Sequence, residues 1–254
     1  LFFLGFLALL IYSCAVNPVT GKSELSIVSF SEEEEVALGS KAYSPAVQQQ
    51  GGFYRDRELE EYVQSVGTRV ARTSHRPGLN YRYRVLNSSV PNAFALPGGF
   101  IVINRGLLVH LSSEAELAAV LGHETGHVTA KHSLAGYQRA LAANLLLTGV
   151  SVAAGGKTGV MEVSSITTSL LENGFSRDQE READWLGIDY MVKAGYSPEG
   201  ADHAKVSGHG AQSQLYIQRG DRRFDQRQEV RRHGEVGPGA TFFRRAPGSS
   251  GRST

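Results

Sequence analysis

Cysteine is almost absent from this sequence, since Cys14 is the single one among 254 residues. One cysteine cannot form an internal disulfide, and without a CxxC pair the chain has no thiolate zinc site or dithiol redox centre. The net charge of +1 is too small to give the basic footprint of a nucleic-acid-binding protein. After residue 12, no apolar run approaches the roughly 20 residues that a membrane-spanning helix needs. The remaining composition, 41% hydrophobic and 20% charged, is typical of a globular protein.

The small net charge hides two chemically different segments. Residues 201–254 hold 10 Lys and Arg against 5 Asp and Glu, whereas the preceding residues hold 16 against 20. The segment after residue 201 is also poor in hydrophobic residues and shows no sustained period of 2 or 3.6. We therefore predict one folded domain over residues 15–201 and an atypical, basic, Arg/Gly-rich and poorly ordered tail over residues 202–254.

The N-terminus carries the signature of export. Residues 1–12 read LFFLGFLALLIY, an apolar run with the length of a secretory h-region. Cys14 follows the run directly and resembles the lipidated cysteine of a bacterial lipobox, although Tyr12 is untypical of that motif. We expect residues 1–14 to be a signal peptide, truncated at its start, with lipidation at Cys14. A plain signal peptide with an incidental cysteine is the alternative.

Apolar spacing and capping residues predict a mainly helical domain with a few strands. Period-two alternation and β-branched residues indicate strands over 81–85 and 100–103. The intervening segment ends in Pro97, Gly98 and Gly99, which favour a sheet edge followed by a turn. Capping residues predict helices that begin after Ser31 and after Ser112 or Ser113. Further helices are expected over residues 59–72, 140–154 and 176–194, the last with Ser176 as its cap. The expected class is α+β, with a small antiparallel sheet beside the main helix.

That main helix contains an HExxH motif, His123-Glu124-Thr125-Gly126-His127. Residues i and i+4 lie about 40° apart around a helix, so both imidazoles face one point. Neutral histidine nitrogens bind Zn²⁺, and a catalytic site has three protein ligands plus a water. Glu124, beside the first ligand, is placed to take a proton from that water. A chance occurrence of the motif is the alternative, and the helical context argues against it.

A third ligand must come from elsewhere in the chain. His132 is the nearest candidate, but it would lie about 140° from His127 if the helix continued, so we interpret it as a surface or interhelical residue. Glu180 is the better candidate, because Glu180 and Asp184 again share one helical face. One carboxylate would bind the metal and the other would accept the free N–H of a ligating histidine. The alternative is a charged helix surface on which the repulsion between the two carboxylates is offset by neighbouring arginines.

Several motifs in this order resemble a known family. The chain is similar to the Ste-type and HtpX-type zinc metallopeptidases, and most similar to their exported bacterial BepA-like and LoiP-like members. The resemblance rests on HETGH, on SRDQEREADWLG about fifty residues later, and on NPVTGKSELSIVS, VPNAFALPGGFIVINRGLL and GYSPEG. It covers about residues 14–201 and implies a mainly helical, zincin-like fold.

The resemblance also implies roles for individual residues. One Zn²⁺ per chain would be bound by His123, His127 and Glu180, with Glu124 as general base and Asp184 supporting a histidine ligand. An extended substrate backbone would pair with the edge strand formed by Asn92, Ala93, Phe94 and Ala95.

The function expected on these grounds is zinc-dependent endopeptidase activity against unfolded or misassembled proteins of the bacterial envelope. The protein would be periplasmic, held at a membrane by a lipid, and without a nucleic-acid partner. The alternative is a zinc-binding envelope assembly factor or chaperone that does not cleave its clients. A membrane-embedded peptidase acting on prenylated proteins is disfavoured, because no suitable apolar segment follows the N-terminus.

Overall fold

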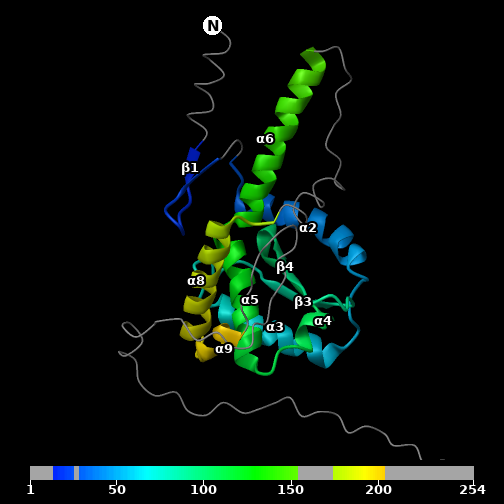
Figure 1. Ribbon diagram of the computed structural model, residues 1–254, viewed down its shortest axis with the longest axis vertical. Coiled ribbons are helices and arrows are strands. Elements are labelled where there is room, and N and C mark those ends of the chain that lie inside the picture. The colour runs from blue at the N-terminus through cyan, green and yellow to red at the C-terminus, as the bar shows by residue number, and fades with distance from the viewer. Residues whose placement is uncertain (1–13, 26–28, 154–173, 204–254) are drawn as a thin grey trace, which may run out of the picture.

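A computed structural model describes residues 14–25, 29–153 and 174–203 (Figure 1). The expected signal peptide therefore lies outside the described residues except for Cys14, which begins strand β1 (Cys14–Val16). The expected basic tail lies outside them from residue 204 onward. Both expectations, including lipidation of Cys14, stay predictions.

The described residues are mainly helical, as the sequence predicts. Ser31 and Ser176 form complete capping boxes with Glu34 and Gln179, and the Ser113 hydroxyl accepts the Glu116 N–H at 3.2 Å. Such caps satisfy N–H groups that have no partner within the helix. The helices are α2 (Glu32–Gln49), α3 (Arg57–Ala71), α4 (Arg105–Leu108), α5 (Glu114–Thr129), α6 (His132–Ala153), α8 (Arg177–Lys193) and α9 (Glu199–His203).

The sheet beside α5 is mixed, which corrects the prediction of an antiparallel sheet. Strand β5 (Phe100–Asn104) is central, pairing in parallel with β3 (Arg82–Leu86) and antiparallel with β4 (Ala93–Leu96). The turn η1 (Pro97–Gly99) reverses the chain between β4 and β5, with φ of 75° at Gly98 and 88° at Gly99. A second, separate hairpin pairs β1 with β2 (Ser23–Leu25).

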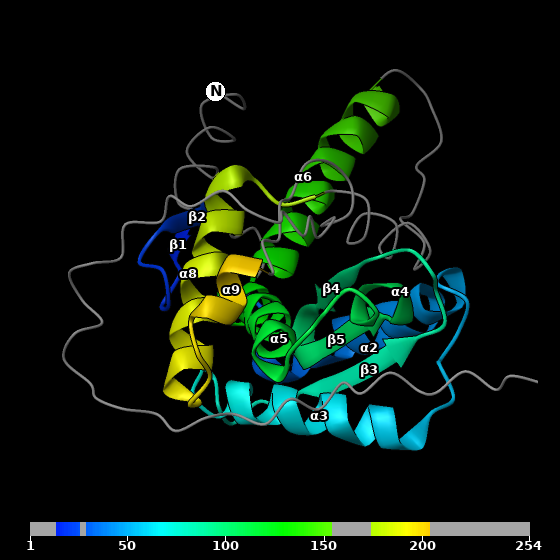
Figure 2. The same cartoon turned by 60° about the horizontal axis from the view of Figure 1, so that its bottom comes forward.

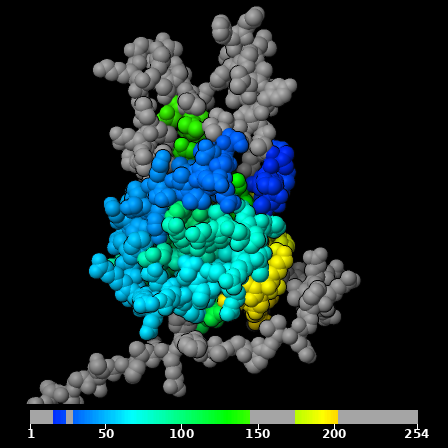
Figure 3. All heavy atoms as spheres, turned by 180° about the vertical axis from the view of Figure 1, so that it is seen from behind, coloured from blue at the N-terminus to red at the C-terminus, as the bar shows by residue number. Residues whose placement is uncertain are grey.

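Strand β5 lies at the centre because both of its faces are apolar. Ile101 and Ile103 join the main hydrophobic core with residues of α3 and α5. Phe100 and Val102 point the other way and pack against residues of α2. Successive residues of a strand face opposite sides, so this arrangement buries all five residues of β5. Figure 2 shows α5 between the sheet and α8, and Figure 3, seen from behind, shows α2 in blue and α3 in cyan with blue-green segments exposed between them.

Helix α5 is the buried centre of the domain and ends abruptly. Every residue from Glu116 to Ala130 is buried. Lys131 then adopts a positive φ of 57°, so the chain changes direction before α6 begins at His132. Helix α6 projects away from the rest of the domain in Figure 1. Among the described residues, no helix is long and apolar enough to cross a membrane.

Glycines allow α8 to lie unusually close to α5. A Cβ atom at Gly187 of α8 would lie 2.6 Å from the backbone nitrogen of His123, and one at Gly122 would lie 2.8 Å from the Gly187 carbonyl oxygen. Contacts this short are excluded for a real side chain. The small residues at this crossing therefore bring the acidic face of α8 within reach of the histidines on α5.

Candidate metal centre

The two histidines of the HExxH motif turn their Nε2 atoms toward one another. The Nε2 atoms of His123 and His127 are 2.9 Å apart, as the i, i+4 spacing on α5 predicts. Glu180, from the first turn of α8, places its Oε2 atom 3.5 Å from His123 Nε2 and 3.9 Å from His127 Nε2. All three side chains are buried, and their ligand atoms lie within 4.8 Å of one another.

This trio fits a bound cation better than it fits a simple hydrogen-bonded cluster. Oε2 of Glu180 is buried and has no hydrogen-bond partner among the described residues. An unpaired carboxylate oxygen in an interior is costly unless a cation or a hydrogen bond compensates it. Two imidazoles and one glutamate are also the protein ligand set of one class of catalytic zinc site. The residues present therefore match a zinc ion in number, chemistry and convergence.

The ring of His123 is fixed from its other side by Asp184. The Asp184 Oδ1 atom lies 2.8 Å from His123 Nδ1, one turn along α8 from Glu180. Burial by itself lowers the pKa of His123, but the carboxylates of Asp184 and Glu180 outweigh burial and raise that pKa to about 10. A histidine binds a metal in its neutral form, so protons and metal compete for this ring.

Glu124 lies beside the trio and is almost completely buried, at 1% exposure. Burial raises the pKa of its carboxyl group to about 7, although the charge of His123 acts in the opposite direction. Its Oε2 atom has no hydrogen-bond partner in the described part of the chain. A carboxyl group that is buried, weakly acidic and without a hydrogen-bond partner at one oxygen has the properties of a general base.

Of the two interpretations of His132 that the sequence left open, the structure supports the interhelical one. His132 is the first residue of α6 and is not at the surface, because its side chain is 0% exposed and contacts residues of α5 and α8. Its Nδ1 atom is 2.9 Å from Nδ1 of His127, and its Nε2 atom is 3.1 Å from Oε2 of Glu182. The angle of about 140° between His132 and His127 assumes that α5 continues past residue 129. In the structure, the positive φ of Lys131 turns the chain back toward the site.

Phe175 is a second neighbour that the sequence analysis does not identify. Its ring stacks on that of His127, with centroids 3.9 Å apart and an angle of 23° between the planes. Phe175 directly precedes the Ser176 cap of α8, which is the only sequence signal that places it near Glu180. It supplies an apolar cover to one face of the His127 ring.

The segment expected to bind an extended backbone is an edge strand among the described residues. Strand β4 pairs with β5 on one side, and the Asn92 carbonyl accepts the Asn104 N–H at 2.8 Å. Antiparallel alternation therefore points the backbone groups of Ala93 and Ala95 away from β5. The carbonyl of Ala95 accepts a hydrogen bond from the Ser133 hydroxyl at 2.9 Å. This places the outer edge of β4 next to the first turn of α6.

The chain resembles known peptidases along most of its length. The profile of Peptidase family M48 matches residues 57–245, which extends past residue 201, where the motifs quoted above end. The mitochondrial metalloendopeptidase OMA1 of Arabidopsis thaliana is 38% identical over 128 residues, which are 50% of this chain and 26% of that protein.

Two bacterial relatives show the same similarity. The putative beta-barrel assembly-enhancing protease of Vibrio cholerae serotype O1 is 28% identical over 176 residues, covering 65% of this chain and 35% of that protein. The metalloprotease LoiP of Escherichia coli K12 is 34% identical over 125 residues, covering 48% of this chain and 49% of its own. The chain thus spans between about a quarter and a half of the length of these curated relatives.

The family profile covers well over half of the chain, and the matched range includes the HExxH helix and the acidic face of α8. The His123, His127 and Glu180 trio lies inside that range and has the ligand set of one class of zinc peptidase. The chain belongs to peptidase family M48, a family of zinc-dependent metallopeptidases.

Proposed function

We propose that this protein is a zinc-dependent endopeptidase of the bacterial cell envelope. The observation that carries the proposal is the buried convergence of His123, His127 and Glu180 beside Glu124, whose Oε2 atom has no hydrogen-bond partner among the described residues. Zn²⁺ bound by this trio supplies a Lewis acid that polarises a scissile carbonyl group and lowers the pKa of a water molecule.

The residues of the chain have separate tasks in this reaction. Glu124 takes a proton from the attacking water and hands it to the leaving amine, as a general acid–base catalyst does. Asp184 accepts the Nδ1–H of His123, which leaves the Nε2 lone pair free to bind the metal. The 2.8 Å contact thus fixes both the tautomer and the orientation of the ring.

The substrate is proposed to bind as an additional strand beside β4. The side chains of Asn92, Ala93 and Ala95 are buried and that of Phe94 is half-buried, so recognition there depends on backbone hydrogen bonds. The substrate would pair with the outward backbone groups of Ala93 and would share or displace the Ser133 hydroxyl at the Ala95 carbonyl. Backbone pairing at a sheet edge is insensitive to sequence. It selects for extended segments, which unfolded or misassembled proteins expose.

The location and the natural substrates rest on analogy with relatives. Some relatives are named for assisting beta-barrel assembly, which supports unfolded or misassembled envelope proteins as substrates. Others are mitochondrial, so the family is not confined to one compartment. The apolar N-terminal run and Cys14 favour periplasmic location with lipid attachment.

Cleavage of casein by the purified protein tests the proposed activity. We expect the wild type to cleave casein and Glu124→Gln to lose at least about 100-fold of that activity, because general acid–base catalysis contributes about 10²–10⁴-fold. The exposed Glu199→Gln on α9 is the matched control and should cleave normally. Client binding without cleavage by wild type and Glu124→Gln alike would favour the assembly factor or chaperone instead.

Metal analysis of the same proteins tests the ligand set. We expect about one zinc per chain in the wild type and in Glu124→Gln, and strongly reduced zinc in His123→Ala and Glu180→Gln. Full zinc occupancy in Glu180→Gln would remove Glu180 from the ligand set.

A further inference from the structure

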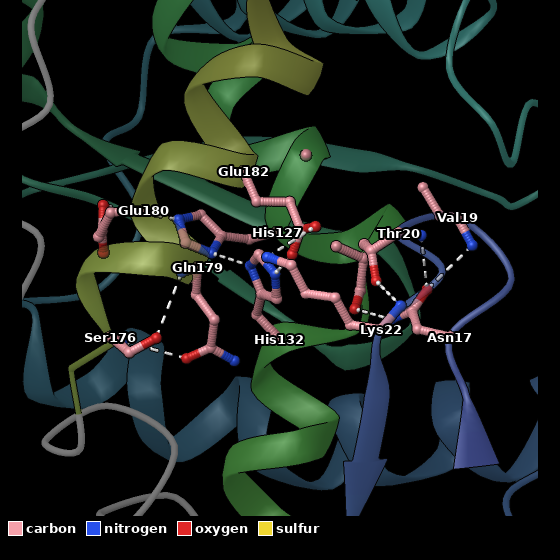
Figure 4. Close-up of polar contacts among 12 residues, drawn as sticks. Asn17, Val19, Thr20, Lys22, His127, His132, Ser176, Gln179, Glu180 and Glu182 are labelled. Carbon is pink, nitrogen blue, oxygen red and sulfur yellow. Dashed lines mark hydrogen bonds and ion pairs between the residues drawn. The ribbon is translucent and has the colours of Figure 1, made fainter.

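A continuous series of polar contacts runs from His127 to the N-terminal hairpin (Figure 4). The His127 ring contacts His132 through their Nδ1 atoms at 2.9 Å, and His132 Nε2 contacts Glu182 Oε2 at 3.1 Å. The other carboxylate oxygen of Glu182 lies 3.3 Å from Lys22 Nζ. Both histidine side chains are 0% exposed, whereas the Glu182 side chain is 14% and that of Lys22 53% exposed.

Geometry alone determines where the protons of this series lie when His127 binds a metal through Nε2. A neutral imidazole carries one proton, so the His127 proton is then on Nδ1 and is donated to His132. His132 must accept on Nδ1, which places its own proton on Nε2, facing the Glu182 carboxylate. Every member of the series then has a partner with the correct donor or acceptor character.

The hairpin formed by residues 14–25 also holds the backbone that places His132. The side-chain amide of Asn17 donates to the Ala130 carbonyl at 2.7 Å, where α5 ends and the chain turns toward α6. Asn17 is itself fixed, because its Oδ1 accepts backbone N–H groups of the hairpin turn at 3.0 and 3.3 Å. The hairpin therefore contacts the site at two points, through Lys22 and through Asn17.

We propose that His132 is a positioning residue for the metal ligand His127, and that Glu182 and the N-terminal hairpin hold His132 in place. This inference rests on the zinc site of the proposed function, but it adds residues that neither the HExxH motif nor the Glu180–Asp184 pair includes. Asp184 orients His123, and the series through His132 orients His127 in the same way. The hairpin that follows the expected lipid anchor is thereby coupled to metal retention.

Zinc affinity of the full chain, measured by competition with a chromophoric chelator, tests the inference. Loss of a residue that orients a metal ligand typically weakens binding about 10–100-fold, and we expect this range for His132→Phe. We expect about 10-fold for Glu182→Gln, since the amide keeps an acceptor oxygen but loses the charge that strengthens the hydrogen bond. For Lys22→Gln we expect about 2–5-fold, because this ion pair is half exposed.

The visible absorption of bound Co²⁺ provides a second readout. The d–d bands report ligand geometry, so they should change in His132→Phe and Glu182→Gln if the His127 ring loses its orientation. His75→Phe is the matched control for His132→Phe. The Nδ1 atom of His75 is hydrogen-bonded to the Tyr190 hydroxyl at 2.6 Å and does not contact the trio. Glu199→Gln serves as the control for the second.

The outcomes separate this inference from the proposed function. A wild-type protein that binds no zinc overturns both. A wild type that binds zinc, together with folded His132→Phe and Glu182→Gln variants of unchanged affinity and unchanged Co²⁺ spectrum, overturns only the positioning role. If circular dichroism shows that His132→Phe does not fold, the near-isosteric Glu182→Gln decides by the same two measurements.

Discussion

At the scale of single residues, the proposed zinc site assigns to carboxylates the role of fixing imidazole tautomers. Asp184 is half exposed, with 46% of its side chain accessible, yet it lies 2.8 Å from Nδ1 of the almost fully buried His123. An acceptor at this position keeps the proton on Nδ1 and leaves Nε2 free for the metal. Asp184 therefore acts through the position of its acceptor atom, and a negative charge elsewhere near His123 would not replace it.

We predict that Asp184→Asn weakens zinc binding by about 10–100-fold, because an amide can present its N–H₂ group to Nδ1 and favour the wrong tautomer. Chelator competition measures the change. Asp189→Asn, on the exposed surface of the same helix, should keep wild-type affinity, since Asp189 pairs with Lys193 at 2.7 Å. Equal affinities in the two variants would contradict the role given to Asp184.

The sequence predicts those parts of the site that repeat within one helix. His123 with His127, and Glu180 with Asp184, are i, i+4 pairs, and such pairs share a helical face whatever the rest of the fold does. His132 could not be placed in the same way. Its position depends on a single backbone torsion, the φ of 57° at Lys131, and no local pattern indicated that α5 ends there.

At the scale of elements, the close approach of α5 and α8 brings the third candidate ligand to the histidines. We predict that Gly187→Ala destabilises the fold by roughly 1–3 kcal/mol, the usual effect of overpacking, because the added methyl group would lie 2.6 Å from the His123 nitrogen. It should also lower zinc affinity, since relief of the clash moves Glu180 and Asp184 away from α5.

Urea unfolding and chelator competition measure these two effects. Gly136→Ala in α6 is the control, because a Cβ there meets only the end of the Arg139 side chain at 3.7 Å. Alanine at that helical position should be neutral or stabilise by up to about 1 kcal/mol. A Gly187→Ala protein with unchanged stability and zinc affinity would show that neither property depends on the close approach of α5 and α8 at this residue.

A buried ion pair joins α2 to the segment between α3 and β3. Glu35 is 1% exposed and accepts hydrogen bonds from Arg76 at 2.9 Å and from the Gly98 N–H at 3.2 Å, with Lys131 Nζ at 3.4 Å. It therefore connects the helix, the turn before β5 and the point where α5 ends.

Removing Arg76 leaves a buried carboxylate with a more distant cation. We predict that Arg76→Ala lowers the free energy of unfolding by about 3 kcal/mol, the lower end of the range for a broken buried pair, because Lys131 remains nearby. Arg57→Ala breaks an exposed pair with Glu61 and should change stability by less than about 1 kcal/mol. Similar values for the two variants in urea unfolding would contradict this account.

Helices of this domain could be predicted well because their ends are encoded locally. Ser31 and Ser176 cap helices where the sequence places them, and Ser113 is the cap of the two candidates that the sequence offers before α5. The parallel pairing of β3 with β5 could not be predicted from the sequence, because it depends on which strand takes the central position, where both faces are buried. That choice is made by contacts between β5 and two helices distant in sequence.

At the scale of the whole molecule, the candidate zinc ligands connect parts of the chain that fold from distant segments. His123 and His127 come from α5, Glu180 comes from α8, and the series through His132 reaches the N-terminal hairpin. A metal bound there stabilises the folded state in proportion to its free concentration, because the unfolded chain lacks the preformed site.

We predict that zinc at about 1,000 times its dissociation constant stabilises the wild type by about 4 kcal/mol, or roughly 10 °C in Tm for a domain of this size. Scanning calorimetry with and without a chelator measures this shift. Glu124→Gln should keep the full shift, because a general base is not a ligand, whereas Glu180→Gln should lose most of it. Loss of the shift in Glu124→Gln would instead place Glu124 among the groups that bind the metal, and the assignment of base and ligand would have to be exchanged.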